Sequence, residues 1–404
     1  IRRGEVPEGY VKTALGLAPA NWQRYTFGDI YTERKEPGDE NLPLLMVSIH
    51  SGVSDGEVDA AELPKQVKRI EDKSQYKKAV SGDLVFNMMR AWQGAIGTVR
   101  TTGMVSPAYI VAEPNDKAYP LFMDYYSRTP QMINQIDRQS YGVTDFRKRL
   151  YWDSFAPISC ALPPIEEQQK IAAILTTQDR VIELKEKCLA EKQRQKKYLM
   201  QQLLTGKKRL PGFNGAWKTD CLGKLFFERK ETNCENIEML AITGTQGIIP
   251  RKELDLKDNS SEDKSKYLRV CVGDIGYNTM RMWQGVSAYS NYEGIVSPAY
   301  TILKPSSSIN AKYFAYLFKM SEIVFLFYRF SQGLVDDTRN LKYENFKKIK
   351  VCYPPDIKEQ TAIAEVLSAA DREIELLQQD IEQEKQKKKA LMQLLLTGIV
   401  RVKT

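Results

Sequence analysis

Apolar residues recur at helical spacing along two long stretches of the chain that contain neither glycine nor proline. The first stretch runs from about Glu167 to Leu204, and the second ends just before Gly398. A helix with such a stripe cannot bury it alone, whereas two such helices can bury it against each other. The pattern therefore predicts two paired helices, each spanning roughly 55–60 Å at about 1.5 Å per residue.

The seam of this helix pair predicts how the helices run. We expect an antiparallel coiled coil with an internal pseudo-twofold axis, because this pairing places one globular part at each end. Polar residues enter the seam at mid-helix, where they weaken packing but help to fix the register; they are Lys192, Lys196, Glu384 and Lys388. The apolar seam residues are Ile171, Leu175, Ile182, Leu189, Leu199 and Leu203 in the first helix, and Ile363, Leu367, Ile374, Ile381, Leu391 and Leu395 in the second.

Outside the long helices, the pattern is typical of a mixed α/β or α+β fold. Short apolar runs with β-branched or aromatic residues, bounded by glycine or proline, predict strands. These runs include 44–49, 82–89 and 107–112. Helical spacing predicts one helix over 119–136, despite Pro130, and a counterpart over 311–330. A final strand in each part is expected to end at a double proline, at 163–164 and 354–355.

The same strings occur twice, about half a chain apart. "GDLVFNMMRAWQG" from Gly82 and "GDIGYNTMRMWQG" from Gly273 share eight of thirteen residues. "SPAY", an "EQ" helix start and an "LLTG" helix end follow in the same order in both halves. Nearly the whole chain is therefore two copies of one unit of roughly 190 residues. The first copy carries four extra residues between about Ser54 and Gln75, a length change that suits a surface loop.

The repeat and the helices together predict the domain organisation. We expect two homologous globular domains joined by two long helices. The segments are an N-terminal segment (1–21), a first globular domain (22–164), a first spacer helix (165–206), a linker (207–216), a second globular domain (217–355), a second spacer helix (356–398) and a C-terminal tail (399–404).

Composition and missing motifs argue against an enzyme. The net charge of +8, from 59 basic and 51 acidic residues, is compatible with a polyanionic partner. The chain has neither a phosphate-binding loop motif nor a dinucleotide fingerprint, and its single histidine excludes most histidine-based sites. Six scattered cysteines and the lack of any apolar run near 18 residues indicate a cytoplasmic protein that does not span a membrane. We therefore expect no catalytic residue and no metal site.

Taken together, these strings resemble the specificity subunit of type I restriction-modification systems. The resemblance rests on "SGDLVFNMMRAWQG", "SPAY", the "PP…EQ" junction, the heptad helix ending in "LLTG", and "RLPGFNGAW" at the start of the second unit. It covers essentially the full length. It implies that each globular part is a target-recognition domain that reads one half of a split DNA sequence, and that the paired helices set the gap and dock other subunits.

The resemblance also implies the partners. They would be double-stranded DNA, two modification (methyltransferase) subunits, and restriction (motor and nuclease) subunits. The partner subunits would use S-adenosylmethionine, ATP and Mg²⁺, whereas this chain would be non-catalytic and would hold no cofactor of its own.

The repeated string supplies the first candidate DNA contacts. Arg90 and Arg281 follow a strand in both copies, and arginine is a good phosphate anchor and reader of guanine. Their identity in both halves suits phosphate or framework roles better than the reading of one particular half-site. The neighbouring tryptophans and glutamines, which either touch DNA or belong to the framework, are Trp92, Gln93, Trp283 and Gln284.

Loops that differ between the halves are better candidates for discrimination between sequences. A basic loop after a glycine suits phosphate contact, with one or two side chains reaching bases. Its candidates are Tyr141, Arg147, Lys148 and Arg149 in the first copy, and Arg339, Asn340 and Lys342 in the second. The stretch 50–76 and its counterpart 245–267 are further candidates.

Two alternatives remain open at this stage. The chain is either a specificity module of another methylase–nuclease system, or a coiled-coil adaptor whose globular ends bind proteins. Sequence-selective and salt-sensitive DNA binding distinguishes a DNA reader from the adaptor. If the chain reads DNA, its related halves should read related half-sites in opposite orientations, which gives an imperfect interrupted palindrome.

Overall fold

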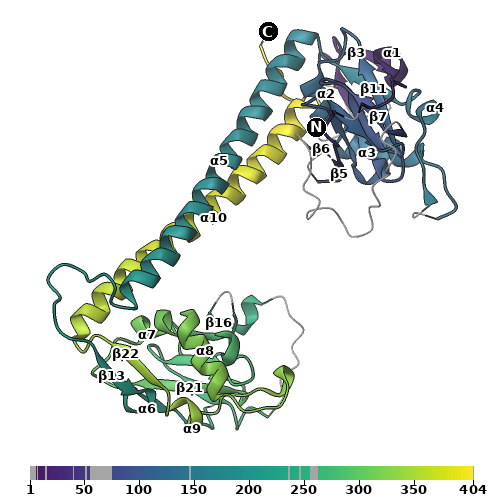
Figure 1. Ribbon diagram of the computed structural model, residues 1–404. Helices are drawn as coiled ribbons and strands as arrows, with labels where there is room; N and C mark the ends of the chain where they lie inside the picture. Colours follow the sequence, from purple (N-terminus) through teal and green to yellow (C-terminus); the bar gives the residue numbers. More distant parts are fainter. Residues whose placement is uncertain are drawn as a thin grey trace. The chain divides into compact units, whose positions relative to one another are not determined.

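The computed structural model describes residues 6, 8–13, 16–39, 41–50, 52–54, 75–144, 147–234, 237–244, 247–254 and 263–403. The chain forms two compact units. Unit 1 comprises Ile1–Lys185 with Asp380–Thr404, and unit 2 comprises Glu186–Gln379. Each unit holds one globular part, named head 1 (residues 10–162) or head 2 (218–353), and one segment of each long helix (Figure 1).

Head 1 is built on an antiparallel sheet of four strands in the order β4-β11-β8-β9. Strand pairs β1-β2, β3-β12, β5-β6 and β7-β10 complete it. The strands are β1 (Tyr10–Thr13), β2 (Gly16–Pro19), β3 (Gln23–Thr26), β4 (Tyr31–Glu33), β5 (Val47–Ser48), β6 (Gly52–Val53), β7 (Lys77–Ala79), β8 (Leu84–Asn87), β9 (Ile96–Thr98), β10 (Gly103–Val105), β11 (Tyr109–Pro114) and β12 (Ser159–Leu162). The helices are α1 (Phe27–Ile30), α2 (Pro120–Tyr126), α3 (Pro130–Arg138) and α4 (Trp152–Phe155), with a 3-10 turn, η2 (Ala91–Gln93).

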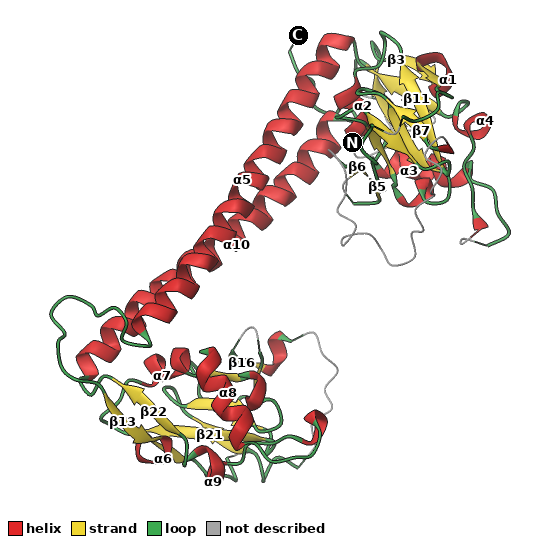
Figure 2. Cartoon of the chain, viewed as in Figure 1, coloured by secondary structure: helices red, strands yellow, loops and turns green. Residues whose placement is uncertain are grey.

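Head 2 repeats this plan, with the sheet order β14-β21-β18-β19. Figure 2 shows the strands of each head gathered together with short helices around them. The strands are β13 (Lys218–Cys221), β14 (Phe226–Glu228), β15 (Leu240–Ile242), β16 (Ile248–Pro250), β17 (Leu268–Val270), β18 (Ile275–Asn278), β19 (Ser287–Tyr289), β20 (Gly294–Val296), β21 (Tyr300–Pro305) and β22 (Lys350–Tyr353). The helices are α6 (Leu222–Leu225), α7 (Ala311–Leu317), α8 (Ser321–Phe330) and α9 (Tyr343–Phe346), with 3-10 turns η4 (Arg251–Glu253), η5 (Met282–Gln284) and η6 (Asp336–Thr338).

Each head has an aromatic core and a buried ion pair at matching positions. In head 1, Phe155 packs on Phe27 and Phe86, with ring centroids 4.4 and 4.6 Å away. At the start of β8, Asp83 accepts a hydrogen bond of 2.8 Å from Arg34 Nε, and burial raises the pKa of this carboxyl while Arg34 opposes the rise. Arg229 and Asp274 form the same pair in head 2, at 2.7 Å. The arginine and the aspartate of these pairs belong to two short strings that occur in both copies, "ERKE" (33–36 and 228–231) and "GD" (82–83 and 273–274).

The single helix predicted over 119–136 is divided in the structure. Helix α2 ends at Tyr126, and α3 begins at Pro130, with Thr129 as its N-cap accepting a hydrogen bond from Met132 N. Proline has no N–H to donate and suits the first helical turn, so Pro130 starts a new helix where the prediction ran straight through. The counterpart over 311–330 is likewise two helices, α7 and α8, although it has no proline.

The long helices are α5 (Ile165–Leu203) and α10 (Ile357–Leu395), and they run antiparallel. In unit 1, Lys388 of α10 forms an ion pair with Asp179 of α5 at 2.5 Å. In unit 2, the equivalent residues exchange helices, and Lys196 of α5 pairs with Asp371 of α10. In each pair a residue from the C-terminal half of one helix meets a residue from the N-terminal half of the other, as in antiparallel helices. The predicted antiparallel helix pair and the mixed fold of two homologous domains are thus confirmed.

The apolar positions of the pair are buried or half-buried throughout. Within unit 1, Ile171 and Leu175 share a hydrophobic cluster with Leu395, and within unit 2, Ile363 and Leu367 share one with Leu203. Ile182 and Ile381 are also buried. The other seam positions are half-buried; they are Leu189, Leu199, Ile374 and Leu391.

Towards the middle of the helix pair, ion pairs between the helices replace apolar contacts at four seam positions. Glu384 accepts a hydrogen bond of 2.6 Å from Gln178 and pairs with Lys185 at 3.0 Å. Lys192 pairs with Glu373 at 2.6 Å. All four residues that were expected to interrupt the seam therefore have a charged partner on the opposite helix, which favours one register over its neighbours.

A tyrosine ties each head to both long helices. Tyr125 of α2 donates a hydrogen bond of 2.6 Å to Asp179, the same carboxylate that pairs with Lys388. Tyr316 of α7 donates one of 2.6 Å to Asp371, which pairs with Lys196. Burial and the acceptor Asp179 raise the pKa of Tyr125 to about 12, so this phenol remains a donor at any ordinary pH.

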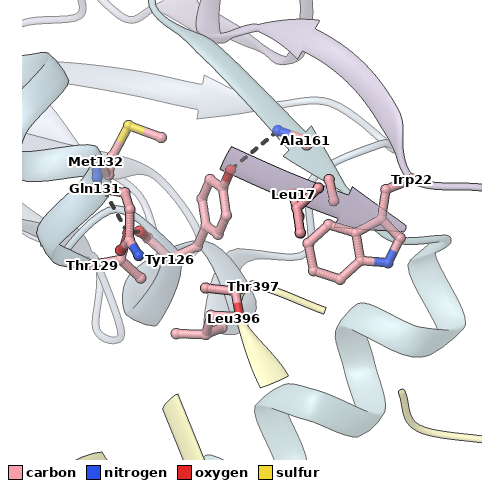
Figure 3. Close-up of a pocket in the computed structure, with 10 residues that line it drawn as sticks. Leu17, Trp22, Tyr126, Thr129, Gln131, Met132, Ala161, Leu396 and Thr397 are labelled. Carbon is pink, nitrogen blue, oxygen red and sulfur yellow. Dashed lines mark hydrogen bonds between the residues drawn. The ribbon is translucent and has the colours of Figure 1, made fainter. Parts of the chain in front are cut away.

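The C-terminal end of each long helix docks on a tryptophan. A Cβ at Gly398 would lie 2.4 Å from Pro19 and 3.1 Å from Trp22, so only glycine fits there. Figure 3 shows Trp22, Leu17 and Tyr126 around the crevice where Leu396 and Thr397 meet head 1. Gly206 approaches Trp217 in the same way in unit 2. The repeated "LLTG" string and the tryptophan that opens each copy therefore form one joint.

The charge of Glu384 should make the stability of the pair depend on pH. The hydrogen bond from Gln178 and the charge of Lys185 lower its pKa from 4.5 to about 2. A lowered pKa means that the ionised carboxylate stabilises the fold above pH 4.5, and that this contribution is lost as the pH falls from 4.5 towards 2. We expect Glu384→Gln to lower the melting temperature at pH 7, and the difference from wild type to shrink below pH 4.5.

Thermal unfolding followed by helical circular dichroism at pH 7, 5, 4 and 3 measures this difference. Glu382→Gln, a neutralisation on the exposed face of the same helix, is the control and should show no such pH dependence. A difference for Glu384→Gln that stays constant over the whole pH series would contradict the prediction.

Candidate nucleic-acid interface

The repeated string folds into one tight turn at the end of the central strand. In head 1, Asn87 at the end of β8 accepts a hydrogen bond of 2.8 Å from Met89 N through its Oδ1 atom. Trp92 Nε1 donates one of 3.0 Å to the Met89 carbonyl. The asparagine and the indole thus hold both sides of Met89 in place, and its side chain remains 41% exposed beside Arg90.

Head 2 contains the same turn. Asn278 accepts a hydrogen bond of 2.9 Å from Met280 N, and Trp283 Nε1 donates one of 2.9 Å to the Met280 carbonyl. Met280 is 49% exposed, and Arg281 next to it is exposed as well. The Asn, Trp and Gly residues of the string therefore build the turn, whereas Met and Arg are presented to solvent by it. We name these the Met-Arg turns (residues 87–94 and 278–285).

The structure separates the candidate residues of this string into two groups. The arginines and glutamines are exposed. Both tryptophans are half-buried with their only N–H bonded to the main chain, which is a framework role. The exposed residues are Arg90, Gln93, Arg281 and Gln284.

A closed loop lies against each Met-Arg turn. In head 2 we name residues 332–340 finger loop 2; Gln332 and Asn340 exchange backbone hydrogen bonds of 2.8 and 2.7 Å at its base. Directly after it, Leu341 N donates a hydrogen bond of 2.8 Å to the Thr279 carbonyl. In head 1, finger loop 1 (141–149) closes through Tyr141 and Arg149, and is followed by a bond of 2.9 Å from Leu150 N to the carbonyl of residue 88.

The basic residues of finger loop 1 differ in their freedom. Lys148 is held by Asp137 at 2.7 Å, with its ammonium 4.9 Å from the Trp92 ring centre. Arg149 donates a hydrogen bond of 2.9 Å to the Lys148 carbonyl. Arg147 and Tyr141 are exposed. Residues 145–146 lie outside the described part of the chain.

Finger loop 2 holds its cation differently. Arg339 lies over the Tyr328 ring at 4.0 Å, donates to the Tyr328 hydroxyl at 2.9 Å and pairs with Asp336 at 2.8 Å. Tyr328 occupies the position that Asp137 has in head 1, so at this one position the partner of the cation is an acid in head 1 and an aromatic ring in head 2. Asn340 is half-buried, with its Oδ1 atom unpartnered, whereas Lys342 is exposed at the start of α9.

Sequence reasoning missed the apolar tips of both loops. Leu334 is 100% exposed and Val335 next to it is 60% exposed. Val143 holds the equivalent position in head 1 and is 94% exposed. The sequence carries a signal for them, because both loops have an apolar residue directly after the glycine.

Other candidates lie away from this face or outside the described residues. Most of the stretch 50–76, and parts of its counterpart 245–267, are not described by the structure. Among the described residues, no cluster of three or more His, Cys, Asp or Glu side chains is placed to bind a metal ion. In the described part of the chain, the helices are too short or too polar to cross a membrane.

Comparisons with known proteins agree on one family. The family model described as "Type I restriction modification DNA specificity domain" matches residues 61–194 and 223–386. The MjaX type I restriction enzyme specificity subunit of Methanocaldococcus jannaschii is 24% identical, with 98% of each chain covered. The MjaVIII specificity subunit of the same organism is 25% identical over 82% of this chain and 83% of its own.

Solved structures show the same fold. The HsdS subunit of Thermoanaerobacter tengcongensis superposes with a TM-score of 0.51 at 17% identity, covering 95% of this chain and 98% of its own. The type I S subunit from M. genitalium superposes with a TM-score of 0.56 at 12% identity, covering 93% and 96%.

The backbone of finger loop 2 should depend on Gly333. Its φ is +139°, and a Cβ there would lie 2.6 Å from the Thr338 carbonyl oxygen on the opposite limb of the loop. We expect Gly333→Ala to open the loop and to speed amide exchange at Gln332 and Asn340 roughly tenfold, which corresponds to a strain of about 1–3 kcal/mol.

Hydrogen exchange measured by mass spectrometry or NMR tests this expectation. Gly244→Ala is the control, because a Cβ at that position meets only one side-chain atom, at 3.9 Å. The core of head 2 should exchange at the wild-type rate in both variants. Unchanged protection of the loop in Gly333→Ala would show that the two limbs do not depend on their contact.

Proposed function

The chain belongs to the family of type I restriction-modification DNA specificity subunits, and we propose that each of its heads reads one part of a bipartite DNA sequence through its Met-Arg turn and finger loop. One observation carries this proposal. In both heads, an exposed Met-Arg pair held by the same hydrogen bonds lies beside a loop whose sequence differs between the heads. To bind two different half-sites, the heads need phosphate contacts that are the same in both and base contacts that differ between them.

The shared arginines suit the DNA backbone. Arg90 and Arg281 are exposed, directly follow the central strand in their heads, and are identical in both copies. Contacts to phosphate fix orientation without reading sequence, so the same residue can serve both half-sites. We assign the base contacts to the positions at which the finger loops differ. Exposed Arg147 in head 1, and exposed Lys342 beside the loop in head 2, are candidates for such contacts.

The helix pair suits the role of a spacer between half-sites and of a dock for modification subunits. Its middle is fixed by paired charges, and each of its ends is fixed to a head by a tyrosine–aspartate hydrogen bond. A stiff, register-locked pair converts helix length into a defined gap on DNA. In this proposal the chain performs no catalytic step itself, and cytoplasmic modification and restriction subunits supply S-adenosylmethionine, ATP and Mg²⁺ chemistry.

Co-expression with the cognate modification subunit, followed by mapping of methylated adenines in genomic DNA, tests the proposal as a whole. The expected result is one interrupted sequence, methylated at both halves. An unmethylated genome, from a complex that assembles and binds S-adenosylmethionine, would overturn it.

The Met-Arg turns should act through phosphates. We expect Arg90→Ala and Arg281→Ala each to weaken DNA binding similarly for all sequences, because a phosphate contact carries no base information. Each lost contact should reduce the slope of log K against log salt concentration by about 0.9. Binding titrations at several salt concentrations, using the complex with modification subunits, measure both effects.

Lys304→Ala provides a matched control. Lys304 is an exposed cation at the far end of β21 from Tyr300, which pairs with Asn278 beside the Met-Arg turn. Its loss should leave the slope unchanged. If Arg281→Ala instead relaxed the sequence at one base position with an unchanged slope, this arginine would be a base reader and the phosphate assignment would be wrong.

The spacer role predicts the result of a paired deletion. Residues 186–192 of α5 lie between Lys185, which pairs with Asp380, and Lys196, which pairs with Asp371. Removing 186–192 together with 373–379 takes one heptad from each helix and keeps both flanking pairs. We expect unchanged half-sites and a gap shorter by up to three base pairs, since seven residues span about 10.5 Å and a base pair about 3.4 Å.

Methylation mapping with the paired deletion reads the gap directly. Deletion of 186–192 alone is the control, and it should destabilise the pair because the flanking ion pairs no longer align. New half-sites with the original gap would refute the spacer role.

A further inference from the structure

The tips of the finger loops expose apolar side chains that the fold itself does not use. Leu334 is fully exposed, Val335 is more than half exposed, and Val143 is almost fully exposed in head 1. Burying a leucine or valine side chain stabilises a protein, so a tip with no protein neighbour forgoes that stabilisation. Scattered surface leucines need no explanation, but here two related loops place an apolar residue at the same position.

Hydrogen bonds within finger loop 2 hold its tip in place. Finger loop 2 is closed at its base by the Gln332–Asn340 exchange, and its limbs touch at Gly333. Above that contact, Thr338 N and Oγ1 both donate to the Val335 carbonyl, at 3.0 and 2.9 Å. Hydrogen bonds within the loop therefore hold its conformation, and in that conformation the apolar side chain at the tip is exposed.

The surroundings of each tip favour DNA as the occupant. Leu341, which follows finger loop 2, is bonded to the end of the strand that precedes Met280 and Arg281, and exposed Lys342 comes next. In head 1, exposed Arg90 holds the place of Arg281, and exposed Arg147 lies in finger loop 1 itself. An apolar point among exposed cations suits a ligand whose backbone is anionic and whose interior is apolar. Double-stranded DNA has this chemistry.

Differences between the two loops argue against a protein partner at this place. The two loops differ at seven of their nine aligned positions, among them the pairs Tyr141/Gln332, Thr144/Val335, Arg147/Thr338 and Arg149/Asn340. Two copies of one modification subunit would need two similar surfaces. Two different DNA half-sites need two different surfaces, each of which still has to enter a groove.

We propose that Val143 and Leu334 are apolar fingers that enter a DNA groove and contact bases, while the neighbouring arginines bind phosphates. This inference rests on the proposed function, and it assigns to each head a specificity residue without charge. Apolar side chains recognise bases by contact with thymine methyl groups or by insertion between base pairs. Either contact excludes water and adds no counterion release.

Substitution of the fingers in the full chain, assembled with its modification subunits, tests the proposal. We expect Leu334→Ser to weaken binding to the mapped duplex about tenfold, to leave binding to an unrelated duplex unchanged, and to leave the salt slope unchanged. Leu334→Met, which keeps an apolar tip, should bind nearly as wild type does. Val143→Ser should produce the same effect, confined to the other half-site in duplexes that carry one altered half.

Val272→Ser is the matched control. Val272 is 62% exposed and precedes β18, whereas the Met-Arg turn follows that strand, so its loss should change nothing. Wild-type affinity in Leu334→Ser, a salt slope reduced by about 0.9, or loss of modification subunits from the complex would each overturn the finger assignment. A wild-type complex that shows no preference for any sequence would instead reject the proposed function itself.

Discussion

A carboxylate on each long helix accepts a hydrogen bond from a tyrosine of the adjacent head and pairs with a lysine of the opposite helix. Asp179 joins Tyr125 and Lys388 in this way, and Asp371 joins Tyr316 and Lys196. Each head also packs on both long helices through apolar contacts, as Ile171, Leu175 and Leu395 do in the core of head 1, and the tyrosine adds a directional hydrogen bond to that packing. The tyrosine–aspartate–lysine joint therefore makes an oriented unit from a helix segment and a head. A reader of DNA needs that orientation, because a groove contact fails when its element is misplaced by a fraction of a base step.

Duplication followed by divergence is visible at the level of single contacts. The residues that build the frame retain their partners in both copies, such as the Arg34–Asp83 pair and its equivalent, Arg229–Asp274. The residues that face outward have changed partners, as with Lys148 on an acid and Arg339 on an aromatic ring. Frame positions are constrained because a buried charge that loses its partner is costly, whereas exposed positions carry no such penalty. The exposed positions can therefore change to suit different DNA sequences with little effect on the stability of the fold.

The helix pair follows the same division. At its ends, equivalent residues make equivalent contacts, whereas its middle is asymmetric: Lys192 of α5 and Glu384 of α10 occupy equivalent positions with opposite charge. Opposite charges at equivalent positions suit pairing between the two different helices. Two copies of α5 would bring Lys185 towards Lys192, which is unfavourable. The mid-helix charges therefore favour a pair made of one helix from each copy.

The sequence by itself determined the duplication, the long paired helices and the mixed fold of the heads, because those properties follow from periodicity and repetition, which are written along the chain. It also predicted that Arg90 and Arg281 follow a strand in both copies, whereas the turn that presents them is seen only in the structure. It did not reveal the break before Pro130, where capping by Thr129 outweighed a continuous apolar pattern. Only the tertiary structure decided which side chains of the finger loops are free. Lys148 and Arg339 are both basic in sequence yet engaged in space, whereas Val143 and Leu334 are apolar in sequence yet fully presented to solvent. The physical reason is that burial and pairing depend on contacts between segments far apart along the chain, and no local pattern records them.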